Sequence, residues 1–244
     1  MLPSGTRTAK GPCALFSIII PSRNIDNLTA CVRAIRAARE TARVIVVDDG
    51  CQWERYHAEL DIRDGAVPFC FARNVNIGIR AAGTGDVILL NDDALLQTPR
   101  GFSLMAEILQ GSPTLRDECG LLACSTNVTG YPGQHQLPRS HQRACRELPT
   151  VAFVAVLIPR RTIDTIGLLD ERFGGPGVYG GEDVDYCIRV RQAGLKVGVS
   201  DFCFVDHSKL PSTFRAAHPG NVAGGDISES NRIGREKWGA VWPL

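Results

Sequence analysis

The sequence has no long apolar run and no excess of charge of one sign. Lysine and arginine number 27 and aspartate and glutamate 26, so the 244-residue chain has a formal net charge of only +1. A nucleic-acid-binding protein usually has a basic excess, and we therefore expect no nucleic-acid partner. No segment approaches the roughly 20 apolar residues that a membrane-spanning helix needs, although peripheral membrane contact stays open.

Paired cysteine motifs are also missing. The nine cysteines are an odd number, and no C-x-x-C pair occurs among them, so zinc and thioredoxin-like sites have little support. The N-terminal segment, residues 1–12, precedes an apolar run that is too short for a signal peptide. Reduced thiols explain this cysteine usage better than a disulfide framework does. We therefore predict a cytoplasmic protein.

The glycine-rich motifs that bind phosphate are absent. No G-x-G-x-x-G opens a helix, and no G-x-x-x-x-G-K-[ST] occurs anywhere in the chain. If a nucleotide binds, a metal ion rather than a glycine loop must meet its charge.

Alternating strand and helix patterns predict an α/β fold. Short runs rich in branched aliphatic residues predict strands at 15–20, 44–47, 68–71, 86–90, 120–124, 151–158 and 196–205. Helical spacing predicts helices that begin near residues 26, 102, 160 and 182. We expect a single domain with a mostly parallel sheet flanked by helices. Its first half, about 13–124, is followed by a loop-rich half, about 125–244.

Acidic pairs follow two of the predicted buried strands. Asp48 and Asp49 come after the second strand, and Asp92 and Asp93 come after the strand at 86–90. The carboxyl ends of parallel strands share one edge of a sheet, where ligands usually bind. Adjacent carboxylates there suit Mg²⁺ or Mn²⁺. Each pair taken alone could equally be a solvated turn.

Two further features have ordinary structural explanations when taken singly. Glu182 and Asp183 begin a predicted helix, where the helix dipole favours acids, and His207 follows a predicted strand. Together with the other acids they fit the transfer of a sugar from a nucleotide-diphosphate donor to an acceptor hydroxyl. Asp93 and His207 would hold a cation that neutralises the leaving nucleotide, and Asp183 would act as general base.

Several motifs, in order, resemble one enzyme family. In chain order these motifs are Ser17-Ile18-Ile19-Ile20-Pro21-Ser22-Arg23-Asn24, Val46-Val47-Asp48-Asp49-Gly50, Phe71 to Arg80, Gly85 to Asp93, Leu168 to Phe173 and Gly181 to Arg189. This series is similar to the motifs of the inverting family 2 glycosyltransferases of GT-A fold, especially their rhamnosyltransferase-like branch. The resemblance covers about residues 15 to 207.

The resemblance implies a role for each matched position. Donor-binding positions would be Pro21, Ser22, Arg23, Asn24, Asp48, Asp49, Asn76, Gly78, Asn91 and Asp92. Asp93 and His207 would bind Mn²⁺ or Mg²⁺, and Asp183 would be the catalytic base beside Glu182. The donor would be a UDP-, dTDP- or GDP-linked sugar, and the acceptor a glycan, a lipid-linked carrier or a small molecule.

Departures from the family pattern leave two alternatives open. Asn91 replaces the first acid of the D-x-D metal motif, which suggests a degenerate module that binds a nucleotide sugar without turnover. Gly5-Thr6-Arg7 with Lys10 faintly resembles the glycine-rich signature of sugar nucleotidyltransferases, although it precedes the first strand. Two loops are expected to contact the acceptor and to close over the site. They are the segment 125–149, which contains several arginines, and the segment 208–233.

Overall fold

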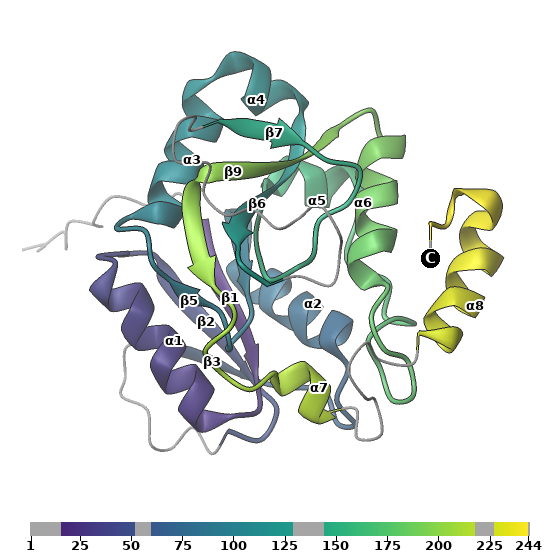
Figure 1. Cartoon of the computed structure of the whole chain (residues 1–244), viewed down its shortest axis with the longest axis horizontal. Helices are drawn as coiled ribbons and strands as arrows, with labels where there is room; N and C mark the ends of the chain where they lie inside the picture. The colour runs from purple at the N-terminus through teal and green to yellow at the C-terminus, as the bar shows by residue number, and fades with distance from the viewer. Residues whose placement is uncertain (1–15, 52–59, 129–143, 218–226, 244) are drawn as a thin grey trace, which may run out of the picture.

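Consecutive apolar residues along the central strands cover both faces of one sheet. The computed structural model describes residues 16–51, 60–128, 144–217 and 227–243 (Figure 1). The strands are β1 (Phe16–Ser22), β2 (Arg43–Asp48), β3 (Asp61–Asp64), β4 (Asp86–Leu90), β5 (Leu95–Leu96), β6 (Cys119–Thr126), β7 (Cys145–Glu147), β8 (Ala155–Ile158) and β9 (Lys196–Asp206). The helices are α1 (Ile25–Ala37), α2 (Phe71–Ala82), α3 (Gly101–Gly111), α4 (Pro113–Glu118), α5 (Arg160–Ile166), α6 (Glu182–Gln192), α7 (Thr213–Ala217) and α8 (Ser228–Trp238), with a 3-10 turn at Gly239–Val241.

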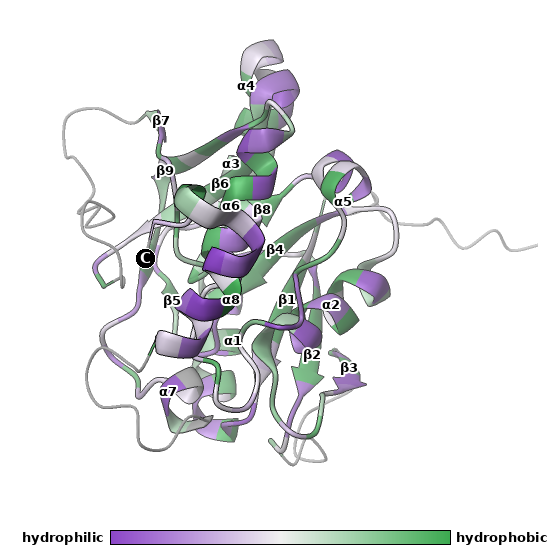
Figure 2. Ribbon diagram, turned by 90° about the vertical axis from the view of Figure 1, so that its right-hand side faces the viewer, coloured by the Kyte–Doolittle hydropathy of each residue, from purple (hydrophilic) through white to green (hydrophobic). Residues whose placement is uncertain are grey.

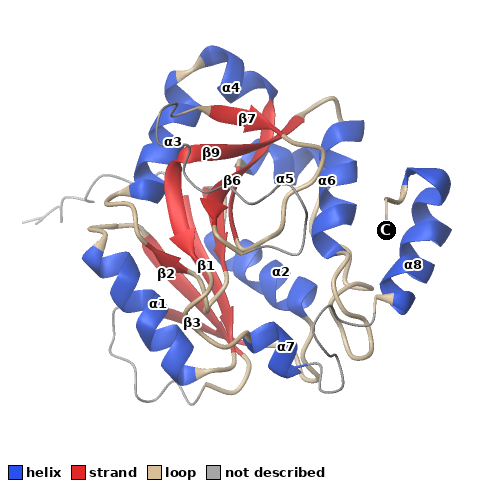
Figure 3. Cartoon of the chain, viewed as in Figure 1, coloured by secondary structure: helices blue, strands red, loops and turns tan. Residues whose placement is uncertain are grey.

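Helices pack on both faces of the sheet and form two hydrophobic cores. Ile18 and Ile20 of β1 face the core that α1 and α3 cover. Ile19, between them, faces the other core, which α2, α5 and α6 cover. Successive strand residues point to opposite faces, so a strand buried on both sides needs apolar residues throughout. Figure 2 shows the central strands in green, and Figure 3 shows helices on both sides of the sheet.

The sheet is mixed, which corrects the expectation of a mostly parallel one. The described strands form a nine-stranded sheet in the order β3-β2-β1-β4-β8-β6-β9-β5, with β7 beside β9. The pairings β1–β2, β1–β4, β2–β3 and β6–β9 are parallel. The pairings β4–β8, β6–β8, β5–β9 and β7–β9 are antiparallel. The α/β fold with helices around a central sheet is confirmed.

Two successive reversals through β8 decide where the strands end. Because β8 runs antiparallel to both β4 and β6, those two strands point in the same direction. β9 is parallel to β6, so its carboxyl end lies at the same edge as those of β1, β2 and β4. The residues that follow these strands therefore gather at one rim of the sheet.

Local structure departs from the sequence patterns at several places. The strand predicted at 68–71 is wrong, because α2 begins at Phe71 and the preceding apolar residues pack beneath it. Asn24 caps α1 by accepting hydrogen bonds from the backbone N–H groups of Asp26 and Asn27, so the helix begins at Ile25. The segment 208–233, expected to be a loop, contains α7 and the beginning of α8.

The described cysteines are free thiols, and all but Cys145 are buried. Among the helices of the described ranges, none combines the length and apolar character needed to cross a bilayer.

Gly78 sets how closely α2 lies against β1. A Cβ at this position would lie 2.2 Å from Ile19 Cγ2, whereas a Cβ at the helical Gly111 would meet nothing within 4 Å. We expect Gly78→Ala to lower the unfolding free energy by about 1–2 kcal/mol, because overpacking outweighs the gain in helix propensity. Gly111→Ala, the matched control, should be neutral or slightly stabilising. Urea unfolding measures both, and equal stabilities would contradict this account of the packing.

Candidate functional site

Strand register brings Asp93 beside His207. The two-residue strand β5 begins just after Asp93 and pairs antiparallel with the end of β9, with Leu95 opposite Asp206. Asp93 lies two residues before Leu95, and His207 lies one residue after Asp206. The antiparallel register therefore brings the two side chains close together. His207 Nε2 lies 3.0 Å from Asp93 Oδ1. Two residues 114 positions apart in the sequence thus meet at the rim.

The second ring nitrogen of His207 fixes how the ring is used. Nδ1 lies 3.0 Å from the carbonyl oxygen of Val128, so a proton on Nδ1 leaves the lone pair of Nε2 directed at Asp93. Burial lowers the pKa of His207, but the hydrogen bond and charge of Asp93 outweigh it, and the pKa is raised overall. Protonation of His207 therefore competes with a cation that would bind beside Asp93.

Asp92 anchors a second cluster, at the ends of β1 and α7. Its Oδ2 accepts hydrogen bonds from Ser22 Oγ and, at 2.8 Å, from Thr213 Oγ1. Asn27 Nδ2 donates to Thr213 Oγ1 at 3.1 Å and to the carbonyl oxygen of Pro211 at 2.8 Å. Burial, with the nearby Asp93 charge, raises the pKa of Asp92 to about 7 despite the Ser22 hydrogen bond. These contacts hold α7 against the rim.

A cavity of about 380 Å³ lies on one side of α7. Its lining includes Arg23, Asn24, Gly50 and Cys51 from the ends of β1 and β2, and Thr213 from α7. The Arg23 guanidinium lies 5.7 Å from the centroid of the Phe69 ring, so a planar cationic group stands at the cavity.

The acids after β2 and the proline before Ser22 have local roles. Asp48 accepts hydrogen bonds from the backbone N–H groups of Gly50 and Cys51, which shapes the turn after β2. Burial raises the pKa of Asp49. Pro21 is buried in β1 opposite Val47 of β2.

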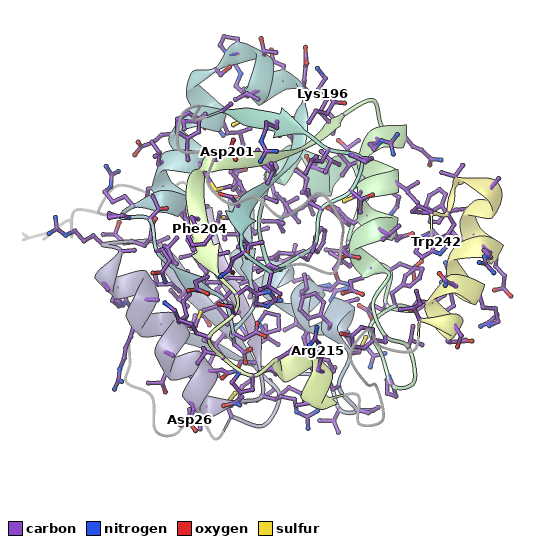
Figure 4. All side chains as sticks on the ribbon, viewed as in Figure 1. Asp26, Lys196, Asp201, Phe204, Arg215 and Trp242 are labelled. Carbon is purple, nitrogen blue, oxygen red and sulfur yellow. The ribbon has the colours of Figure 1, made fainter. Side chains whose placement is uncertain are left out.

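A larger cavity, of about 590 Å³, brings together the acids predicted for catalysis and metal binding. Asn91, Asp93 and His207 line it together with Glu182 and Asp183. The remaining lining residues come mainly from the approach to α6, from the segment around α7 and from α8: Phe71, Val128, Ala152, Phe153, Val154, Tyr179, Gly180, Gly181, Ser208, Leu210, Pro211, Ser212, Arg215, Ile227 and Ser230. Figure 4 labels Arg215, which α7 contributes to this lining.

Glu182 is an unusual carboxyl group in this cavity. The residue is 7% exposed, and its Oε2 has no hydrogen-bond partner among the described residues. Burial and the adjacent Asp183 charge raise the pKa of Glu182 to about 8. Two neighbouring carboxyl groups with one proton between them can both accept and donate hydrogen bonds at neutral pH.

The donor atoms at the rim fit a divalent cation. In the described part of the chain no group of three or more His, Cys, Asp or Glu side chains could hold a metal, so Asp93 and His207 would be two ligands in a shell that the substrate completes. The Val128 carbonyl fixes the His207 tautomer that leaves Nε2 free to ligate. Asn91 lines the same cavity, and its buried Oδ1 also lacks a hydrogen-bond partner within the part of the chain that the structure describes. Carboxylate oxygen, imidazole nitrogen and an amide oxygen suit Mn²⁺ or Mg²⁺.

Of the ten positions predicted to bind the donor, Arg23, Asn24 and Asn91 line the described cavities and the other seven do not. Two of these seven have structural roles within α2. Asn76 is buried in α2, where its amide donates to the Leu169 carbonyl and to Glu171 and accepts from Leu169 N–H. Gly78 packs against Ile19 of β1. Both stabilise the position of α2, and neither lines the described cavities.

Other expectations lie outside the site or outside the described residues. Arg146, which lies in the loop expected to contact the acceptor, forms a two-pronged ion pair with the buried Asp201 and holds β7 to β9. Residues 129–143 and the glycine-containing segment at 5–10 lie outside the described ranges. Thr213, Arg215 and Ser230 line the cavities and lie in the segment 208–233 that was expected to contact the acceptor. Sequence reasoning did not single them out, since no periodic pattern or motif surrounds them.

Glu182 makes stability depend on pH. Its carboxyl pKa is near 4.5 when unfolded and about 8 when folded. Between these values the unfolded chain releases a proton that the folded chain keeps, so stability falls as the pH rises, by at most about 1.4 kcal/mol per unit. Glu182→Gln should match the wild type near pH 5 and be more stable near pH 8. The pKa of Asp92 is also raised on folding, so the Glu182→Gln variant should keep part of the pH dependence of stability.

Thermal unfolding at several pH values measures this difference. A gain of 1 kcal/mol corresponds to roughly 2–4 °C in a domain of this size. Glu107→Gln, on the exposed side of α3, is the matched control and should follow the wild-type curve. Parallel curves for wild type and Glu182→Gln would show that the buried carboxyl does not hold its proton.

The fold is shared with nucleotide-sugar enzymes of known structure. GalNAc-T7 with UDP, GalNAc and Mn²⁺ matches at a TM-score of 0.67 and 15% identity, over 91% of this chain and 48% of that one. The Pyrobaculum calidifontis mannosyltransferase PcManGT, with GDP-Man and Mn²⁺, matches at 0.59 and 17%, over 85% and 63%. Staphylococcus aureus TarS, residues 1–349, matches at 0.55 and 14%, over 78% and 59%.

These three structures are GT-A glycosyltransferases, and this chain spans about half to two thirds of their lengths. UTP-bound UGPase from Acinetobacter baumannii also matches, at a TM-score of 0.50 and 10% identity, over 90% and 93%. No protein-family model matches the sequence, and the comparison with curated proteins finds no match. At these identities the comparisons establish the fold, a single GT-A-like α/β domain.

Proposed function

We propose that this protein is a metal-dependent, inverting glycosyltransferase that moves a sugar from a nucleotide-diphosphate donor to an acceptor hydroxyl. The observation that carries the proposal is the larger cavity, where the Asp93–His207 pair and the Glu182–Asp183 pair share one lining. One pair suits a cation beside a diphosphate, and the other suits removal of a proton from an acceptor. The glycosyltransferase structures with the same fold support this reading.

The donor spans both cavities in this proposal. The nucleoside occupies the smaller cavity, where the Arg23 guanidinium can stack on a base. The diphosphate extends past Ser22 and Asp92 toward Asp93, and Arg215 of α7 adds positive charge at the larger cavity. The start of α7 lies between the two, since Ser212 lines one cavity and Thr213 the other. A UDP-, dTDP- or GDP-linked hexose or deoxyhexose fits this division.

The chain's own groups then direct a single displacement. Asp183 accepts the proton of the acceptor hydroxyl as its oxygen forms a bond to the anomeric carbon. The bond from that carbon to the diphosphate oxygen breaks, and the electron pair leaves with the nucleotide. Attack from the side opposite the leaving group inverts the anomeric configuration. Mn²⁺ or Mg²⁺ held by Asp93 and His207 would supply charge neutralisation at the leaving diphosphate. Glu182, whose pKa burial raises to about 8, keeps its proton near neutral pH and can donate a hydrogen bond to the acceptor beside Asp183.

Finer features of the proposal rest on the sequence motifs. The ordered matches from residue 15 to 207 favour family 2 and its rhamnosyltransferase-like branch. The acceptor would be a glycan, a lipid-linked carrier or a small molecule. The free thiols support a cytoplasmic location, because such a compartment keeps cysteines reduced.

Two alternatives have distinct signatures. A sugar nucleotidyltransferase, which the fold likeness to UGPase keeps open, would release pyrophosphate from a nucleoside triphosphate and a sugar phosphate. A binding module without turnover, suggested by Asn91, would bind a donor and transfer nothing. A product assay with a panel of nucleotide sugars and acceptors distinguishes all three.

Donor binding should depend on both the metal and Asp93. A matching nucleotide sugar at 100 times its Kd should stabilise the wild type by about 2.7 kcal/mol in Mn²⁺ and much less in a chelator. Asp93→Asn removes the charge at constant shape and should abolish the difference between Mn²⁺ and chelator. Asp26→Asn, at an exposed acid of α1, is the control and should retain it. Equal stabilisation of Asp93→Asn and wild type would remove Asp93 from the metal site.

Transfer should depend on Asp183 without a matching effect on donor binding. Asp183→Asn cannot accept the acceptor proton, so we expect kcat to fall by about 10²–10⁴-fold. Donor-dependent stabilisation in Mn²⁺ should change little, because Asp183 acts on the acceptor. Full transfer rates in Asp183→Asn would assign the base to another residue.

A further inference from the structure

Helix α6 is buried on two sides. Cys187 and Val190 face the core beneath the sheet, whereas Val184 and Ile188, one turn apart, face the opposite way. α8 and the chain after it cover this second side, as Figures 1 and 3 show. Trp242 stacks on Phe173 with ring centroids 5.6 Å apart, and Figure 4 shows Trp242 beside α8. The helix that begins with Glu182 is therefore held between the sheet and the C-terminal helix.

A hydroxyl group of α8 contacts the chain just before Glu182. Ser230 is fully buried and lines the larger cavity. Its Oγ lies 2.5 Å from the carbonyl oxygen of Tyr179 and 3.0 Å from that of Gly180, so one O–H is shared between two acceptors. The following Gly181, with φ at +96°, turns the chain into α6. Ser230 thus holds the peptide groups that set the direction of the first turn.

A second anchor lies just beyond the acidic pair. Asp185 is fully buried, and its Oδ1 accepts hydrogen bonds from Lys237 Nζ at 2.6 Å and Trp238 Nε1 at 2.9 Å. Lys237 Nζ also lies 2.7 Å from Asp170 Oδ2, which ties α8 to the loop before α6. The two anchors on α8 therefore bracket Glu182 and its neighbour in the sequence.

We propose that α8 is a positioning element of the active site, and that Ser230 is its positioning residue, which holds the first turn of α6 so that the Glu182–Asp183 pair faces the cavity. This inference rests on the proposed function for its effect on catalysis. A helix that only covered apolar surface would need no buried hydroxyl at the cavity and no polar contacts on both sides of the acidic pair. Here both anchors are placed where a small rotation of the first turn would move the carboxyl groups.

Ser230→Ala tests the proposal through catalysis. It removes the hydroxyl, and we expect kcat to fall on the order of 10- to 100-fold, because small displacements of a catalytic group are costly. The KM for the donor and donor-dependent stabilisation in Mn²⁺ should stay within about twofold, since the donor side is untouched. Ser228→Ala, at an exposed serine of the same helix, should keep the wild-type kcat.

A readout that does not need transfer keeps the two proposals separate. Two titratable groups lie near Glu182: Asp183 on the same helix and Cys70 at the start of α2. Burial raises the pKa of the Cys70 thiol, and the charge of Glu182 adds to this increase. If Ser230 holds the first turn of α6, its loss exposes Glu182, and the pH dependence of stability between pH 5 and 8 becomes shallower. Absence of transfer in the wild type would refute the proposed function, whereas this slope still decides the role of Ser230.

Trp238→Phe provides a second variant. It keeps the aromatic ring but loses the Nε1–H donor to Asp185, so it should change kcat and the pH slope in the same direction and by less. It also serves if Ser230→Ala does not fold. A kcat and a pH slope equal to those of Ser228→Ala in both variants would overturn the proposal. So would a loss of donor affinity at unchanged kcat.

Discussion

The pairing of β5 with β9 is the constraint on which the rest of the rim depends. β5 has only two residues, yet its register against Asp206 places Asp93 next to His207. The carboxyl ends of β4 and β9 share an edge because β8 is antiparallel to both β4 and β6, so that the two reversals cancel, and because β9 is parallel to β6. Had only one of the two β8 pairings been antiparallel, the histidine would lie at the far edge of the sheet. The pairing directions of β8 therefore help to place the site.

The acids at this rim differ from acids elsewhere in the protein. Asp170 and Asp206 are also partly desolvated, but hydrogen bonds from Arg172 and Lys237 to the first, and from Ser208 and Lys209 to the second, lower their pKa values well below the usual range. Asp92 instead contacts hydroxyl groups, and burial raises its pKa. Surface and scaffold acids are thus neutralised by the protein's own cations. At the cavities burial instead raises the pKa values of Asp92 and Glu182.

Patterns of consecutive aliphatic residues predicted β1, β2 and β4 because these strands are buried on both faces. β3 was missed because Asp61–Asp64 is a charged edge strand, half exposed, with no such pattern. The run 68–71 was misread because an apolar segment beneath a helix start looks like a buried strand. The placement of Asp93, His207 and Asp183 on one cavity followed from strand ends and a helix start. Thr213 and Ser230 meet partners 121 and 51 positions away, and no local pattern encodes such contacts.

The two sides of the cavity differ in how well the sequence predicts them, and the sequence separation between contacting residues explains this difference. The proposed donor side is built from turns that come directly after strands, so its geometry is set by the sheet and is readable from sequence. The proposed acceptor side is built from α6, whose direction depends on the glycine turn at Gly180 and Gly181 and on α8 behind it. Left-handed glycines allow several directions for a helix that follows them, so packing from outside must select one. The C-terminal helix supplies that packing, because Phe173, Ile233 and Trp242 form a core that excludes the sheet altogether. Changes in α8 can therefore alter the first turn of α6 while the rim around Asp93 and His207 keeps its geometry.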